Sequence, residues 1–177
     1  MEIRPTARTW GGLGTQGGGV VHGKKYSQKE CWEKSLGCPT GDVWSHENAD
    51  VQTLRTLSTT WNNLGSIGGG MIHGQNYSKK DCFAKAAGVD PTNPKPWDNL
   101  GKYGGGEVNG KVYSKKECFL RSLHLNFRDP FTWKHLAKVG GGKVNGEFYS
   151  KKDCLNMVCC LRGSVWTGHS TKVCFRC

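Results

Sequence analysis

The pattern of polar and apolar residues repeats four times along this chain. Its tryptophans mark the copies: Trp61, Trp97 and Trp133 lie 36 residues apart, and an earlier copy begins at Trp10. The same register repeats a glycine triplet, a His-Gly or Asn-Gly pair, a Tyr-Ser pair, an acidic residue and a cysteine. A fixed period of roughly 20 to 50 residues is typical of stacked arrays, in which each unit buries its apolar face against its neighbours.

The first half of each copy predicts a short helix that is ended by glycine. In the third copy, Pro94 suits the first helical turn because proline has no N–H group to leave without a partner. Trp97 and Leu100 follow at a spacing of three, which places them on one face of the helix. The triplet that begins at Gly104 ends the helix, because glycine tolerates the positive φ of a left-handed exit.

The second half of each copy predicts a tight turn and then a capped helix. Asn109-Gly110 favours a type I′ hairpin turn, with a plain glycine loop as the alternative for so short a ribbon. Ser114 and Glu117 form a capping box, which starts a helix with an apolar stripe. The other copies carry the same box as Ser27/Glu30, Ser78/Asp81 and Ser150/Asp153.

This order of residues resembles the tetratricopeptide repeat (TPR). The residues that carry the resemblance are, in order, Trp61, Leu64, Gly65, Phe83, Ala86, Pro91 and then Trp97 of the next copy. The stretch Lys85-Ala86-Ala87-Gly88 and the period are similar to the Sel1-like branch of the same superfamily. The glycine triplet and the pair that follows it stand where a standard TPR has helical residues. The resemblance implies a mainly α fold, an α-solenoid of about four TPR-like helix-turn-helix repeats, each with a glycine-rich loop or small β-hairpin between its helices.

The repeat register divides the chain into six segments. They are a degenerate first repeat over residues 1–36, an insertion or linker over 37–57, a second repeat over 58–92, a third over 93–128, a truncated fourth over 129–154 and a Cys-rich tail over 155–177. The first helix of the second copy is expected to begin near Ser58. Because the pattern stops after Cys154, we interpret the tail as a metal-binding segment or as unrelated to the array, in preference to a folded cap.

Charge and composition narrow the choice of partners. The formal net charge is +11 and the sequence pI is about 9.3, which favours nucleic acid, anionic membrane surfaces or acidic proteins, although spread lysines also keep a glycine-rich array soluble. No stretch approaches the ~18 apolar residues of a membrane span, and the N-terminus lacks the apolar part of a secretory signal. Nine cysteines without such a signal favour a cytoplasmic location, with a nuclear one possible.

Paired lysines are the candidate partner-binding residues. They are Lys79, Lys80, Lys115, Lys116, Lys151 and Lys152. Each pair occupies the first two positions of a second helix, where the helix dipole disfavours cations. Helix N–H groups with two lysines per repeat predict a row of phosphate sites, and the alternative is a solvated helix start with long flexible side chains.

The sequence provides weaker evidence for metal-binding, phosphate-binding or catalytic sites. The repeat cysteines Cys31, Cys82, Cys118 and Cys154 occur one per repeat, which is not metal-ligand spacing, so they are expected to pack in the core. Weak zinc candidates in the tail are Cys159, Cys160, His169, Cys174 and Cys177. The stretch Gly105 to Lys111 nearly matches a phosphate loop but lacks the hydroxyl residue after the lysine. No catalytic constellation emerges, so we expect no enzyme activity, no cofactor and no small-molecule substrate.

The sequence therefore predicts a non-catalytic repeat scaffold that mediates protein–protein interaction. Its partner is expected to be another protein. The alternative is a basic, sequence-tolerant nucleic-acid-binding array that uses the paired lysines.

Overall fold

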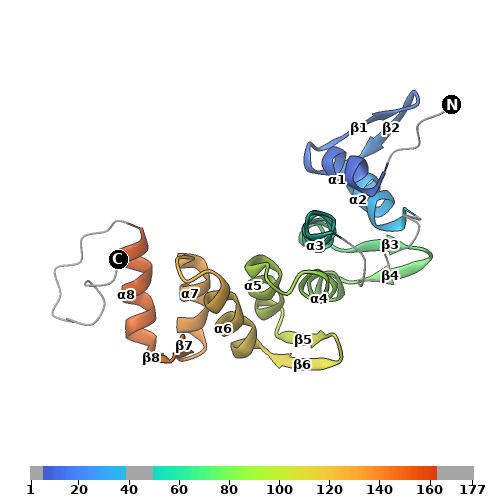
Figure 1. The fold of residues 1–177 in the computed structure, drawn as a ribbon. Helices are drawn as coiled ribbons and strands as arrows, with labels where there is room; N and C mark the ends of the chain where they lie inside the picture. Colours follow the sequence, from blue (N-terminus) through green and yellow to red (C-terminus); the bar gives the residue numbers. More distant parts are fainter. Residues whose placement is uncertain (1–5, 39–49, 163–177) are drawn as a thin grey trace. The chain divides into compact units, whose positions relative to one another are not determined.

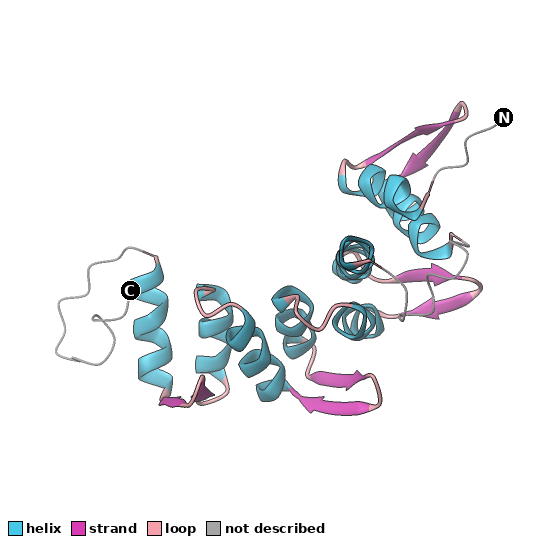
Figure 2. Cartoon of the chain, viewed as in Figure 1, coloured by secondary structure: helices cyan, strands magenta, loops and turns pink. Residues whose placement is uncertain are grey.

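The computed structural model describes residues 6–38 and 50–162, which fold into helices separated by short antiparallel hairpins (Figure 1). Two compact units make up the chain, Met1–Pro96 and Trp97–Cys177. The described part is mainly helical, as predicted, and Figure 2 shows a pair of strands between the two helices of each repeat.

Each repeat has the order helix, strand, strand, helix. The first contains α1 (Ala7–Thr15), β1 (Gly18–Val21), β2 (Lys24–Ser27) and α2 (Gln28–Gly37). The second contains α3 (Val51–Ser66), β3 (Gly70–Ile72), β4 (Gln75–Tyr77) and α4 (Lys79–Val89). The third contains α5 (Pro94–Lys102), β5 (Gly105–Val108), β6 (Lys111–Ser114) and α6 (Lys115–Leu125). The fourth contains α7 (Pro130–Lys138), β7 (Gly142–Val144), β8 (Glu147–Tyr149) and α8 (Lys151–Leu161).

The segment after each glycine triplet is a hairpin and not a plain glycine loop. Its first turn residue has a φ of 48° to 50° in the four described hairpins, and the glycine that follows also has a positive φ. These angles are those of a type I′ turn, whose twist matches that of the two strands. The first turn residues are His22, His73, Asn109 and Asn145.

The middle glycine of each triplet is required by a close backbone approach. A Cβ on Gly105 would lie 2.2 Å from the carbonyl oxygen of Tyr113, and one on Gly69 would lie 2.0 Å from that of Tyr77. Both glycines also have a positive φ, which side chains resist. The triplet therefore allows the first strand to begin directly after the helix and to pair closely with the second strand.

The capping boxes form as predicted. Ser114 Oγ accepts a hydrogen bond from the Glu117 N–H at 3.2 Å, and Glu117 Oε2 accepts one from the Ser114 N–H at 2.7 Å. The same reciprocal pair begins α2, α4 and α8. Each second helix thus has a fixed first turn directly after its hairpin.

The core of each repeat is a tryptophan from the first helix in contact with a tyrosine from the second strand. The ring centroids of these pairs are 4.8 to 4.9 Å apart in all four repeats. Trp61, Trp97 and Trp133 are at most 2% exposed, and the leucine three residues after each is fully buried. The predicted i, i+3 face is therefore the buried face of the first helix.

In the second and third repeats, a glycine on the first helix lies directly against an aromatic ring of the second helix. A Cβ on Gly101 would lie 2.5 Å from a ring carbon of Phe119, and one on Gly65 would lie 2.8 Å from a ring carbon of Phe83. In these two repeats the glycine therefore leaves room for the aromatic ring of the second helix. At the equivalent positions the fourth repeat has Ala137, which is buried, and Leu155, which is 44% exposed.

Neighbouring repeats within a unit pack the second helix of one against the first helix and hairpin of the next. In the first unit, α2 packs on α3 and β3, and Glu33 Oε1 accepts a hydrogen bond from the Met71 N–H at 3.0 Å. In the second unit, α6 packs on α7 and β7, and His124 Nδ1 lies 2.7 Å from Asn145 Oδ1. Both contacts join a second helix to the following hairpin.

Two helices extend beyond the limits expected from the repeat register. Helix α3 begins at Val51 and not near Ser58, because the Asp50 carboxylate caps it by accepting from the Thr53 N–H at 2.7 Å. Its added turns place Leu54 in a partly buried position. Helix α8 continues past Cys154 to Leu161, with Met157 5% exposed in the core.

Candidate functional site

The predicted lysine pairs lie in the first turns of three second helices. Lys79 and Lys80 begin α4, and the other two pairs begin α6 and α8. Five of these six lysines are exposed, and Lys79 is partly buried. The adjacent capping box places a carboxylate at each of these helix starts. Its hydrogen bonds with the Ser114 hydroxyl and backbone N–H lower the pKa of Glu117, so a negative charge already accompanies that helix start.

One member of these pairs lies against the next repeat. A Cβ on Gly142 would lie 3.0 Å from Lys116 Cε, so the Lys116 side chain passes beside the first strand of the fourth hairpin. Leu120, one turn further along α6, lies against the same glycine at the same distance. Lys116 therefore borders the space between α6 and the fourth hairpin.

A groove of about 300 Å³ lies between α6 and the fourth hairpin. We call it the third-repeat groove, and its lining residues are Tyr113 from β6, Glu117, Leu120, Arg121 and His124 from α6, and Lys143, Val144 and Asn145 from the fourth hairpin. Its aliphatic contributors are Leu120 and Val144, and Val144 is 2% exposed. Its charged contributors are mainly cations. Sequence reasoning missed this groove because its walls come from two different repeats.

The first repeat contains a groove at the same register. We call this space of about 450 Å³ the first-repeat groove, and its lining residues are Trp10, Glu30, Glu33, Lys34, Gly37 and Cys38. Glu30 and Lys34 correspond to Glu117 and Arg121, whereas Glu33 stands where the third repeat has Leu120. The two grooves therefore share a framework but differ in charge and polarity.

Cations lie over the aromatic core of both repeats. Arg121 Cζ is 5.3 Å from the centroid of the Trp97 ring, and the equivalent Lys34 Nζ is 5.5 Å from that of Trp10. Lys111 Nζ lies 5.1 Å from the Tyr113 ring centroid in the same way. Such cation–π contacts hold the charged groups in place beside the groove. In the sequence, Arg121 and Lys34 can be recognised as the arginine or lysine three residues after the repeat cysteine.

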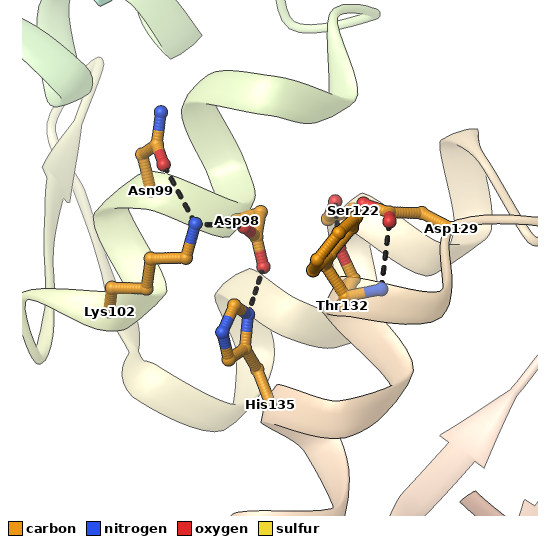
Figure 3. A network of polar contacts seen from close by, with 8 residues as sticks. Asp98, Asn99, Lys102, Ser122, Asp129, Thr132 and His135 are labelled. Atoms are coloured by element: carbon orange, nitrogen blue, oxygen red, sulfur yellow. Dashed lines mark hydrogen bonds and ion pairs between the residues drawn. The ribbon is translucent and has the colours of Figure 1, made fainter. Parts of the chain in front are cut away.

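A polar cluster around the buried Asp98 joins α5 to α7 (Figure 3). Asp98 is 6% exposed, and its carboxylate accepts from Lys102 Nζ at 2.7 Å and lies 2.8 Å from His135 Nδ1. Burial raises the pKa of Asp98, but the hydrogen bonds from His135 and Lys102 outweigh it, so the pKa lies below its ordinary value. The His135 ring also stacks on Phe119, with centroids 5.4 Å apart. Both carboxylate oxygens are thus engaged, and the cluster ties two successive first helices together.

A second polar group in Figure 3 lies between α6 and α7. Thr132 Oγ1 donates to Asp129 Oδ2 at 2.7 Å and lies 3.4 Å from Ser122 Oγ. Asp129 also caps α7 by accepting from the Phe131 N–H at 2.9 Å. These hydroxyls satisfy buried polar groups at a helix contact.

The repeat cysteines lie in the core, which confirms the prediction from their spacing. All four are fully buried, and burial raises the pKa of the Cys82 thiol to about 12 and that of Cys154 to about 11. A thiol with so high a pKa is a poor nucleophile at neutral pH.

The tail cysteines fall partly outside the described residues. Cys159 and Cys160 are partly buried on α8, whereas His169, Cys174 and Cys177 lie outside the described residues. Among residues 6–38 and 50–162, no three His, Cys, Asp or Glu side chains gather as metal ligands would.

Comparisons with known proteins provide no relative of this chain. No protein-family model, curated protein or solved structure matches it. In the described ranges, no helix is both long and apolar enough to cross a membrane.

Proposed function

We propose that this chain is a non-catalytic repeat scaffold, built as a TPR-like α-solenoid, that binds other proteins. One observation supports this proposal more than any other. Each of the four described hairpins exposes one large apolar side chain on its outer face: Val20, Met71, Val112 and Phe148, which are 60% to 72% exposed.

These four side chains belong to equivalent cross-strand pairs of their hairpins. In each hairpin the cross-strand partner of the apolar residue is polar: Lys25, Asn76, Glu107 and Lys143. A single exposed apolar residue on a protein surface is ordinary. Its recurrence on the same face of every described hairpin, each time beside a polar partner, favours a surface that contacts a protein with apolar anchors and a polar surround.

The decisive test is a hairpin-face variant. It carries Val20→Ser, Met71→Ser, Val112→Ser and Phe148→Ser, and it is compared with the wild type by affinity purification and mass spectrometry. We expect proteins that co-purify with the wild type to be at least about tenfold depleted, because buried apolar anchors carry much of the binding free energy.

A matched control separates this surface from general loss of apolar area. Val51, Ile67, Phe131 and Leu155 are also exposed but lie outside the hairpins. Their joint replacement by serine should leave the same proteins bound. Equal depletion by both variants, with equal helical content by circular dichroism, would contradict a hairpin surface.

Sequence-tolerant nucleic-acid binding is the second candidate. It is favoured by the exposed lysine pairs in the first turns of α4, α6 and α8 and by the net charge of +11. Replacing the six paired lysines by glutamine should then weaken binding to single-stranded DNA and reduce its dependence on salt. Partners that disappear from the wild type after nuclease treatment favour this candidate, and partners that are retained favour the protein scaffold.

A further inference from the structure

We infer that the third-repeat groove binds an extended acidic segment of a partner protein, with one aliphatic side chain in the groove and carboxylates on either side. This inference rests on the proposed scaffold function and assigns a partner chemistry to one of its surfaces. It is carried by the apolar floor of the groove together with the cations around it.

The floor accepts a side chain and not a larger molecule. Leu120 is half-buried, Val144 is buried, and both lie where α6 meets the fourth hairpin. A volume of about 300 Å³ stands at the lower limit of ligand pockets, so it suits a single side chain of a bound segment better than a cofactor.

The rim is positively charged. Arg121 lines the groove from α6, and Lys143 lines it from the fourth hairpin. In the described part of the chain, neither Arg121 nor Lys143 forms an ion pair. The one lining carboxylate, Glu117, is hydrogen-bonded within its own capping box.

Arg121 is already positioned for a carboxylate. Its guanidinium lies over the Trp97 ring, with Cζ 5.3 Å from the ring centroid. Stacking of this kind restricts the side chain, so less conformational entropy is lost when the guanidinium binds a carboxylate through two N–H groups.

The groove suits a protein better than a nucleic acid. Single-stranded nucleic acids bind largely by stacking bases on open aromatic rings. Two ring side chains line this groove. Tyr113 already contacts Trp97 and has Lys111 over its ring, and His124 Nδ1 lies 2.7 Å from Asn145 Oδ1. The floor itself, formed by Leu120 and Val144, is aliphatic.

The first-repeat groove provides a natural contrast. Glu33 takes the place of Leu120 there, and its carboxylate accepts a hydrogen bond from the Met71 N–H. An acidic segment would meet a second carboxylate in that groove, in addition to the capping-box Glu30 that corresponds to Glu117, and no aliphatic floor. The charge of the occupant is therefore predicted to depend on the residue at this helix position.

The test measures binding of a fluorescent peptide, Asp-Glu-Leu-Asp-Glu, to the full-length protein by anisotropy. The groove variant carries Arg121→Gln and Lys143→Gln. We expect at least about a tenfold weaker affinity, because it removes two charge-assisted hydrogen bonds. The control variant carries Lys134→Gln and Lys138→Gln, two exposed lysines of α7 that do not line the groove, and should bind within about twofold of the wild type.

Further variants test the floor and guard against misfolding. Leu120→Glu reproduces the first-repeat residue at an already half-buried position and should also weaken binding about tenfold. A probe with serine in place of leucine should bind the wild type more weakly than the original. Unchanged circular dichroism and urea midpoints show that each variant is folded.

Three results would overturn the inference. They are no saturable binding of the probe to the wild type, equal loss in the groove and control variants, or displacement of the probe by oligothymidylate that binds more tightly. Co-purification with the Leu120→Glu variant separates the two proposals, because Leu120 lies on α6 whereas Lys143 also lies on the hairpin face beside Phe148. A Leu120→Glu variant that loses the peptide but keeps every protein partner would leave the scaffold intact, whereas partners unaffected by the hairpin-face variant would count against the scaffold surface itself.

Discussion

At the scale of single residues, glycine shapes each repeat through backbone conformation and through space. Gly104 and Gly105 both have a positive φ, but only Gly105 would crowd another atom if it carried a Cβ. The first of the two therefore needs glycine for its torsion angle alone. The second needs it for the torsion angle and for its contact with the opposite strand.

This difference predicts unequal costs for two neighbouring substitutions. Gly104→Ala should lower the free energy of unfolding by roughly 1 to 2 kcal/mol, the cost of a left-handed residue with a side chain. Gly105→Ala should cost about 2 kcal/mol more, because its Cβ would lie 2.2 Å from the Tyr113 carbonyl oxygen. Urea unfolding followed by circular dichroism measures both. Equal losses of unfolding free energy in the two variants would show that the close approach of Gly105 to the Tyr113 carbonyl oxygen does not require glycine.

At the scale of helices, the contact between the two helices of a repeat depends on a matched pair of residues. Gly101 lies against Phe119 in the third repeat, and Gly65 lies against Phe83 in the second. In both repeats a Cβ on the glycine would crowd the aromatic ring. The two positions should therefore be energetically coupled.

A double-mutant cycle tests the coupling. Gly101→Ala should destabilise the wild type by roughly 1 to 3 kcal/mol through overpacking, despite the better helix propensity of alanine. In a Phe119→Leu background the same change should cost at least about 1 kcal/mol less. Gly12→Ala, at a helical position with open space around it, is the control and should be neutral or stabilising. If the losses of unfolding free energy are additive in the cycle, the predicted coupling between Gly101 and Phe119 is wrong.

The Asp98 cluster gives the α5–α7 contact a dependence on pH. Because the folded-state pKa of Asp98 is lowered, its stabilisation is fully present above the unfolded-state pKa of about 3.9 and is lost as the pH falls through the folded-state pKa. Asp98→Asn should therefore cost about 2 kcal/mol at near-neutral pH, and less at about pH 3.

Urea unfolding of the wild type and Asp98→Asn at both pH values provides the measurement. Glu107→Gln removes an exposed hairpin carboxylate and controls for the change in net charge. A difference between wild type and Asp98→Asn that does not shrink in acid would show that the carboxylate is not the titrating group.

Local elements could be predicted from the sequence because their signals are local. The capping box at Ser114 and the turn at Asn109 depend on residues a few positions apart. The early start of α3 was missed because Asp50 and Leu54 lie outside the repeat register. The Asp98 cluster and the third-repeat groove were missed because they depend on how one repeat packs against the next, which no short stretch of sequence encodes.

At the scale of the whole molecule, each repeat encloses a reduced thiol. The structure predicts that iodoacetamide modifies Cys82 and Cys154 at least about a hundredfold more slowly in the native protein than in urea, because burial raises the pKa of both thiols and blocks access. Mass spectrometry of a labelling time course measures each site, with the partly buried Cys159 as an internal comparison. Similar rates in the native and unfolded protein would mean that the repeats open readily.

The third-repeat groove has walls from successive repeats, so it belongs to neither repeat alone. The ligand that the groove binds therefore depends on both repeats: replacing the fourth hairpin would change the lining of the groove even if the sequence of α6 stayed the same. A change in the order of existing repeats would then create new binding surfaces without any substitution within a repeat. The variety of such surfaces would grow with the number of possible neighbours and not with the number of repeats.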